Sequence, residues 1–165
     1  MIRHLVNIIL YFLPPTRLFM VRRILLRCAG LNLANTVSFC GRSWIFGRGS
    51  LEIACGTWIS PGAILYTHND AKIVIGSKCD IGPDVVFVVG SHLIGDSGQR
   101  AGKGTAKSII IGDGTWIGAR VTVLEGVTIG NGCVIAAGSV VHQNIEDNCL
   151  VAGVPAKVKR KLNLN

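Results

Sequence analysis

The sequence predicts an all-β fold, a parallel β-helix assembled from six-residue repeats. Branched apolar residues recur at every sixth position near the C-terminal end, and glycine often follows them. This set is Ile111, Ile117, Val123, Ile129, Ile135 and Val141. A period of six is neither helical nor strictly alternating, so each hexad is expected to form a short strand and a tight turn. Three hexads would then complete one triangular coil.

The same register continues toward the N-terminus, with insertions at the corners of the coils. The inward residues predicted for the earlier coils are Leu33, Phe39 and Ile45, then Ile53, Ile59 and Leu65, then Ile75, Ile81 and Phe87. The largest insertion lies between Phe87 and Ile111. It predicts an extended loop over residues 93–108, with His92 at its root.

Composition and charge divide the chain of 165 residues into three parts: a helical segment (1–30), the β-helix (31–156) and a basic tail (157–165). The net charge of +8 belongs to the two ends, since residues 1–30 carry five arginines and residues 157–161 carry four bases, neither with an acid. A general nucleic-acid surface is therefore not expected. An anionic ligand near the C-terminus and anionic lipid near the N-terminus fit this distribution better.

The N-terminal segment has two interpretations. Its apolar run from Leu5 to Leu13 is too short to span a bilayer, and Pro14 interrupts it. The segment would form two short helices on a membrane surface or a helical cap over the end of the core. Six cysteines without a CxxC pair favour free, buried thiols in a reducing compartment. The expected location is the cytoplasm, peripherally at the inner face of the membrane if the helices bind lipid.

Two C-terminal motifs resemble the hexapeptide-repeat acyltransferases. They read "IGDGTWIGARVTVLEGVTIGNGCVIAAGSVV" and "LVAGVPAKVKRKL", and the resemblance covers about residues 31–161. It is greatest to O-acetyltransferases of sugars, including the galactoside and maltose enzymes and those that modify capsule or O-antigen. It implies a left-handed β-helix, a homotrimer with active sites between neighbouring subunits, acetyl-coenzyme A as the donor, and no metal.

The resemblance also implies roles for individual residues. His92 in "GSH" would be the catalytic base, because a histidine pKa lies near working pH. The acceptor residues would be Asp70, Asn69 and His68. The register independently places Asp70 beside His92, because Leu65 stacks on Phe87. The coenzyme A positions implied are Trp116, Ala119, Ala137, His142, Gln143, Lys157 and Arg160.

Simpler roles stay open for some of these residues. Trp116 would pack at a corner, Lys157 and Arg160 would solvate the tail, and Asp70 would be an ordinary turn residue. An acceptor-binding asparagine of the galactoside and maltose enzymes corresponds here to Gly62. The sequence therefore does not specify which acceptor is used.

The expected function is transfer of acetyl from acetyl-coenzyme A to a saccharide hydroxyl. The acceptor would be a surface polysaccharide, capsule, O-antigen or lipid-linked glycan precursor. The alternatives are acetylation of a small molecule such as an antibiotic or free sugar, and a non-catalytic β-helix scaffold. A zinc hydratase resembling the γ-class carbonic anhydrases is disfavoured, because only His68 and His92 are expected near each other.

Overall fold

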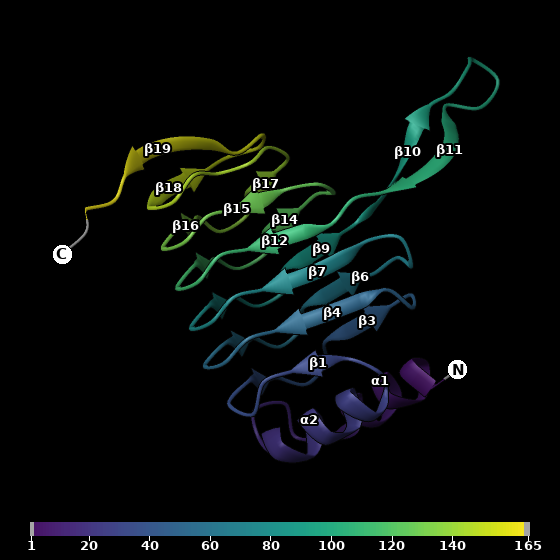
Figure 1. The fold of residues 1–165 in the computed structure, drawn as a ribbon, viewed down its shortest axis with the longest axis vertical. Helices are drawn as coiled ribbons and strands as arrows, with labels where there is room; N and C mark the ends of the chain where they lie inside the picture. The colour runs from purple at the N-terminus through teal and green to yellow at the C-terminus, as the bar shows by residue number, and fades with distance from the viewer. Residues whose placement is uncertain (1, 164–165) are drawn as a thin grey trace.

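The computed structural model describes residues 2–163, which form a stack of short strands closed at one end by two helices (Figure 1). The helices are α1 (Ile2–Phe12) and α2 (Phe19–Cys28). The coils rise from the helices toward the C-terminus, and a hairpin projects from one edge near the top. Within residues 2–163, no helix combines the length and the apolar character needed to cross a membrane.

Parallel strands form three flat faces of the solenoid, called here faces A, B and C. Face A contains β1 (Asn32–Leu33), β4 (Ser50–Ile53), β7 (Lys72–Ile75), β12 (Ile109–Ile111) and β15 (Thr128–Ile129). Face B contains β2 (Ser38–Phe39), β5 (Trp58–Ile59), β8 (Asp80–Ile81), β13 (Trp116–Ile117), β16 (Val134–Ile135) and β18 (Cys149–Ala152), with β19 (Lys157–Lys161) antiparallel at its edge. Face C contains β3 (Trp44–Phe46), β6 (Ile64–Tyr66), β9 (Val86–Val88), β14 (Thr122–Val123) and β17 (Val140–Val141).

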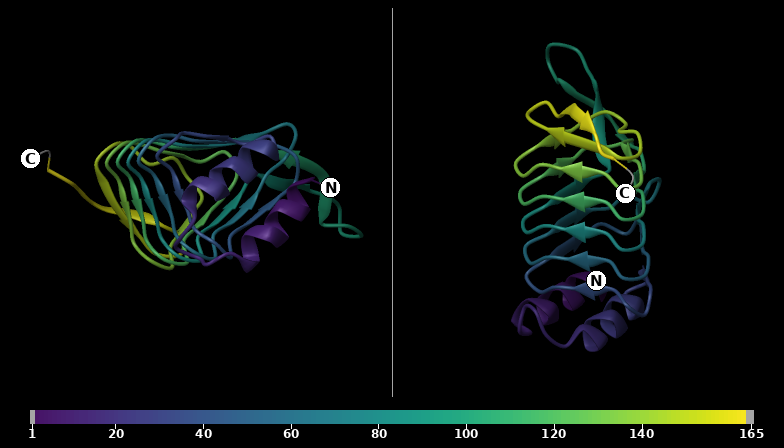
Figure 2. Two further views of the ribbon diagram at one scale, coloured as in Figure 1. Left: turned by 90° about the horizontal axis from the view of Figure 1, so that it is seen from below. Right: turned by 90° about the vertical axis from the view of Figure 1, so that its left-hand side faces the viewer.

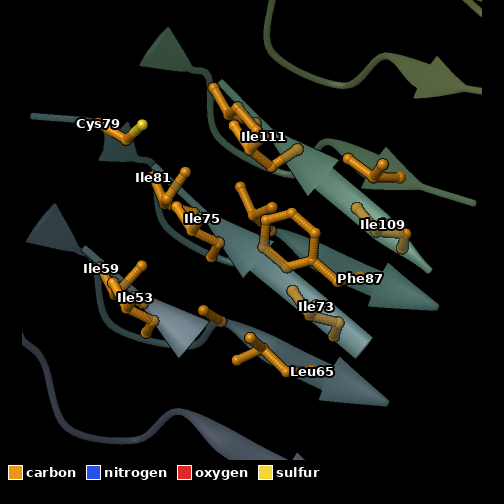
Figure 3. Close-up of a cluster of buried hydrophobic side chains, with 14 of the residues drawn as sticks. Ile53, Ile59, Leu65, Ile73, Ile75, Cys79, Ile81, Phe87, Ile109 and Ile111 are labelled. Carbon is orange, nitrogen blue, oxygen red and sulfur yellow. The ribbon is translucent and has the colours of Figure 1, made fainter. Parts of the chain in front are cut away.

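The register predicted from the hexads is confirmed on all three faces. Leu65 pairs with Phe87 on face C, and Ile81 pairs with Ile117 on face B. The inward side chains of successive coils stack in a closed core, as Figure 3 shows for its middle coils. Because each inward side chain covers the one below it, residues such as Phe87 and Ile117 have no exposed surface. Burial on this scale is the main stabilising term of the fold.

The helices lie across the N-terminal end of the solenoid, as the left view in Figure 2 shows. Their arginines donate hydrogen bonds to backbone carbonyls of the chain they cover. Arg3 Nη1 binds the carbonyl oxygens of Gly47 (3.0 Å) and Gly49 (2.8 Å). Arg23 binds Val37 O at 2.8 Å. The capping interpretation of residues 1–30 therefore describes how this segment packs.

Arg22 holds the turn between the two helices. Its side chain is fully buried and donates to the carbonyl oxygens of Leu10, Leu13, Pro14 and Arg17. Burial raises the pKa of the neighbouring Cys40 thiol to about 11, against the opposing effect of the Arg22 charge. Cys40 is therefore a protonated, inert packing residue at neutral pH.

Three sequence expectations change in detail. The sequence predicts an extended loop over residues 93–108, but the excursion is a hairpin of β10 (Gly90–Ile94) and β11 (Ala101–Ala106). The basic tail contains β19, which pairs with β18 and so extends the folded part beyond residue 156. All six cysteines are free, but Cys28 and Cys55 are exposed rather than buried.

Candidate functional site

His92 lies within the first strand of the hairpin rather than before a loop. It is exposed and pairs with Gly104, and the register shifts by a bulge before Ile94. Bulges of this kind re-aim side chains next to active sites. The His92 Nδ1 lies 2.9 Å from the carbonyl oxygen of Gly102. A carbonyl can only accept, so Nδ1 carries the hydrogen and Nε2 of the neutral ring is free to accept a proton.

His68, Asn69 and Asp70 form the corner between β6 and β7, one coil below the hairpin. All three are exposed. The Asp70 carboxylate lies 3.5 Å from Nδ1 of His68, and its backbone N–H also donates to that nitrogen. Among residues 2–163, His68 is the one basic side chain within 4 Å of that carboxylate. The neighbour of the Asp70 carboxylate in the structure is thus His68, in the same corner.

A groove of about 590 Å³ runs along face B and its corner with face C. It is lined by three predicted coenzyme residues, Trp116, Ala119 and Ala137. Trp116 stands on β13 and is 56% exposed, so it lines the groove instead of filling a corner. The other residues that line the groove are Ser60, Asp80, Gly82, Pro83, Gly118, Val134, Ile135, Ala136 and Leu150. Its walls are mostly apolar, as expected for a site that takes a thin organic chain.

Two backbone amides in the groove are open. In the described part of the chain, the N–H groups of Ala119 and Ala137 donate to no protein acceptor, and each lies in the turn that follows its strand. The equivalent turn positions in lower coils are Pro61 and Pro83, which have no N–H to offer. The open backbone N–H groups of the groove therefore lie in the coils of Ala119 and Ala137.

Glycines keep these amides accessible. A Cβ at Gly82 would stand 2.8 Å from the Ala119 nitrogen, and a Cβ at Gly118 would stand 2.7 Å from the Ala137 nitrogen. Both distances are shorter than real side chains tolerate. The groove thus fits the arm of coenzyme A, whose amide carbonyls need donors and whose methylene groups need apolar walls.

The remaining predicted cofactor residues lie at two places. Arg160 and Lys157 belong to β19, and Arg160 pairs with Leu150, which lines the groove. A 2.7 Å hydrogen bond from Lys161 Nζ to Glu146 ties this strand down and lowers the pKa of the Glu146 carboxyl. His142 and Gln143 follow β17 on face C, are exposed, and do not line the groove.

The hairpin and the groove occupy opposite edges of the solenoid. Figure 1 shows β10 and β11 projecting from one edge, while β16 and β18 lie at the other. The structure brings together Trp116, Ala119 and Ala137, and separately His68 and Asp70. His92 does not line the groove. Over residues 2–163, no three side chains of His, Cys, Asp or Glu gather into a metal site.

Sequence reasoning missed several groove residues, Asp80 and Leu150 among them. Both point outward on face B, in the strand column that also contains Trp116 and Val134. The signal was present in the repeat. Each of these residues directly precedes an inward residue of face B, so the register that predicts the core also predicts this outward column.

Fold and groove together define a left-handed parallel β-helix of hexapeptide repeats. Residues 108–143 match the family model described as bacterial transferase hexapeptide (six repeats). The galactoside O-acetyltransferase of Lactococcus lactis is 36% identical over 115 residues, which cover 70% of this chain and 56% of that protein. The chain thus spans little more than half the length of that relative.

Solved structures agree in fold. The hexapeptide-repeat acetyltransferase VCA0836 of Vibrio cholerae, complexed with acetyl-coenzyme A, has a TM-score of 0.75 and 27% identity, covering 99% of this chain and 86% of that one. The polySia-specific acetyltransferase NeuO has a TM-score of 0.70 and 30% identity, covering 81% and 62% respectively. The chain is thus similar, in its hexapeptide repeats and in its fold, to hexapeptide-repeat acetyltransferases.

Proposed function

We propose that this chain is an acetyl-coenzyme A-dependent O-acetyltransferase that acetylates a hydroxyl group of a saccharide. The observation that carries the proposal is the arrangement of His92. Its Nδ1 is engaged by Gly102 O at 2.9 Å, which leaves Nε2 of the exposed ring for an acceptor. A histidine held in one tautomer on an exposed hairpin is suited to accept a hydroxyl proton.

The donor binds along the groove of face B. The open amides of Ala119 and Ala137 bind its amide carbonyls, and Trp116 packs against its chain. Arg160 and Lys157 face its phosphates from the adjoining strand β19, where basic side chains suit anionic groups. His142 and Gln143 contact the phosphate end from the neighbouring face. The relative VCA0836 is described in complex with acetyl-coenzyme A, which supports this choice of donor.

Transfer proceeds directly from donor to acceptor within the ternary complex, without an acyl-enzyme intermediate. His92 Nε2 accepts the proton of the acceptor hydroxyl while its oxygen bonds to the thioester carbonyl carbon. The carbon–sulfur bond then breaks, and the imidazolium of His92 returns the proton to the departing thiolate. His68 and Asp70 contact the acceptor, with Asn69 beside them.

The active site is completed by a second copy of the chain in a homotrimer. Hairpin and groove lie at opposite edges of one chain, so the hairpin of one subunit reaches the groove of the next. Leu93 and Ile94 of the hairpin support this arrangement, since they are 56% and 88% exposed. Apolar side chains so exposed are typical of surfaces that another subunit covers.

The acceptor belongs to a surface polysaccharide or a lipid-linked glycan, and the helices contact the membrane that carries it. Ile2, Leu5 and Phe12 of α1 and Met20 and Ile24 of α2 all turn at least half of their surface outward. This apolar outer face suits a lipid surface, and Arg17, exposed in the turn between the helices, suits anionic headgroups. Binding to anionic and neutral vesicles, with Phe12→Ser and Met20→Ser as variants, tests this part separately.

The deciding experiment measures free thiol release from acetyl-coenzyme A with a panel of saccharides and aminoglycoside antibiotics. Wild type should turn over with a saccharide, and His92→Ala should lose about a hundredfold or more in kcat. His68→Ala is the comparison, because loss of an acceptor contact should raise KM while kcat stays within a few fold of wild type. Full activity of His92→Ala would contradict the base assignment, and turnover with an antibiotic alone would contradict the saccharide.

A further inference from the structure

Three aromatic side chains form a continuous strip on the outside of face C. The rings of Trp44 and Phe46 lie 5.9 Å apart at 12°, and those of Phe46 and Tyr66 lie 5.1 Å apart at 13°. Tyr11 of α1 extends the strip at its lower end, 6.1 Å from Trp44. Phe46 is 39% exposed and Tyr66 is 43% exposed, so the strip remains open to solvent.

The fold does not require aromatic side chains at these positions. Higher coils of face C carry aliphatic or polar residues in the same two outward columns, including Val86, Val88, Thr122 and Val140. The chain has ten aromatic residues among 165, and three of them gather over two neighbouring strands. An exposed aromatic cluster of this kind is typical of a surface that binds a ligand or a partner.

The strip leads to the proposed acceptor corner. Tyr66 precedes His68 by two residues, and it pairs in register with Val88, at the end of the strand that leads into the hairpin. Figure 1 shows β3, β6 and β9 one above another, beneath β10 and β11. A molecule lying on the strip therefore has one end beside His68 and Asp70 and just below His92.

Polar groups border the strip on its lower side. A cavity of about 620 Å³ lies between α1 and face C, and its lining includes His4, Asn7, Phe46 and Arg48. Arg48 is exposed, and within residues 2–163 no carboxylate lies within 4 Å of its guanidinium. Aromatic surface with a few hydrogen-bond donors beside it is the usual composition of a ligand site.

We propose that Trp44, Phe46 and Tyr66 form an extended subsite for the sugar units that flank the one being acetylated. The acceptor is then an oligosaccharide or polysaccharide rather than a free sugar. Sugar rings present one face of C–H bonds, which packs against the negative π-face of an aromatic ring, while their hydroxyls bind donors such as Arg48 and His4. This inference rests on the proposed function, because the reacting sugar unit is the one beside His92.

The test compares one acceptor at several lengths. The saccharide that supports turnover is supplied as monosaccharide, disaccharide, tetrasaccharide and hexasaccharide to wild type, Phe46→Ala, Tyr66→Ala and the double variant. Ile110→Ala is the matched control, since Ile110 is 40% exposed on face A, away from the strip. The KM of wild type should fall with length, and each strip variant should raise KM for the hexasaccharide about tenfold. The kcat for the monosaccharide should stay within about twofold of wild type, because the strip does not touch the reacting unit.

Binding without turnover separates this inference from the proposed function. Saturation-transfer NMR with malto-, chito- and galacturono-hexaose reports glycan contact even if no acceptor is acetylated. Loss of the signal in Tyr66→Ala but not in Ile110→Ala supports the strip. Equal KM at all lengths, an unchanged signal in the double variant, or a changed oligomeric state of the strip variants would each overturn it. The last result would make the strip an interface between copies of this chain.

Discussion

The groove on face B and the hairpin beside face C are built in different ways. The groove is a product of the repeat, because Trp116, Val134 and Leu150 occupy one outward column whose inward neighbours form the core. The hairpin interrupts the repeat, and pairs such as Ser91 with Thr105 hold it together locally. The ends of the excursion are already joined, since Lys107 N–H donates to Val89 O at 2.9 Å.

The two regions should therefore respond differently to substitution. Groove residues directly adjoin the buried side chains of the core stack, so their positions are as rigid as the core. Hairpin residues depend on few packing contacts and are free to meet another subunit. Changes in the two regions should therefore separate activity, stability and assembly.

The largest expected effect concerns the joining of the two regions. His92→Ala and Ala137→Trp should each lower activity by about a hundredfold, the first by removing the base and the second by filling the groove. Subunits of the two variants, unfolded and refolded together, should recover about a quarter of the wild-type sites, because in the proposed trimer each site takes its hairpin and groove from different chains. Thiol release before and after joint refolding measures the recovery.

A mixture that is never unfolded provides the control for this experiment and should stay inactive while subunits do not exchange. Absence of recovery after joint refolding into trimers would mean that one chain supplies both halves of its own site. The hairpin and groove of one chain would then form a site within that chain, instead of a site shared between subunits.

A second prediction compares two truncations of isoleucine. Ile117→Ala, in the fully buried stack under the groove, should lower the free energy of unfolding by about 3 kcal/mol. Ile94→Ala on the hairpin removes a side chain that is 88% exposed and should cost under about 0.5 kcal/mol. Urea unfolding at a concentration low enough to keep both variants monomeric measures the costs, because another subunit covers Ile94 in the proposed trimer. Similar costs would show that the hairpin is part of the folding core.

The core is predictable from sequence because one residue type at one spacing determines it. The six-residue register alone places Ile75, Ile81 and Phe87 in the stack, because a shift by one residue would turn these apolar side chains to the outside of the coil. The hairpin strands are not predictable in this way. Residues 102–107 alternate small residues with Lys103, Thr105 and Lys107, but they lack the apolar column that marks a strand facing a core. Backbone pairing alone forms β11.

The site is predictable to the extent that it follows the register. The six-residue register places Trp116 and Ala119 in one groove, but it does not determine which carboxylate lies beside a histidine at a corner. Asp70 turns to His68 because corner side chains are not stacked and choose partners locally. Composition likewise could not reveal that Arg3 and Arg23 bind carbonyls, since a guanidinium suits a lipid phosphate equally well.

A third prediction tests the open amides of the groove. Ala119→Pro removes one N–H at a turn position where Pro83, also preceded by glycine, already occurs one coil below. The coil should therefore fold as before, while the Kd for coenzyme A rises about tenfold through loss of one hydrogen bond. Calorimetry measures the Kd, and thermal unfolding checks the fold. Ala119→Ser keeps the N–H and should bind normally, so equal weakening in both variants would indicate a steric effect.

The smallest expected effect belongs to the strand that borders the groove. Arg160→Ala should weaken coenzyme A binding roughly threefold at low salt, because an exposed cation contributes little to an ion pair. The effect should disappear above about 0.5 M salt, where the Debye length is far below its value of about 8 Å at physiological ionic strength. Lys159→Ala is the control, since Lys159 lies at the register shift of β19 and has no pairing partner on β18. Equal losses in the two variants would assign the effect to the net charge of the strand, and the specific position of Arg160 beside Leu150 would then have no part in binding.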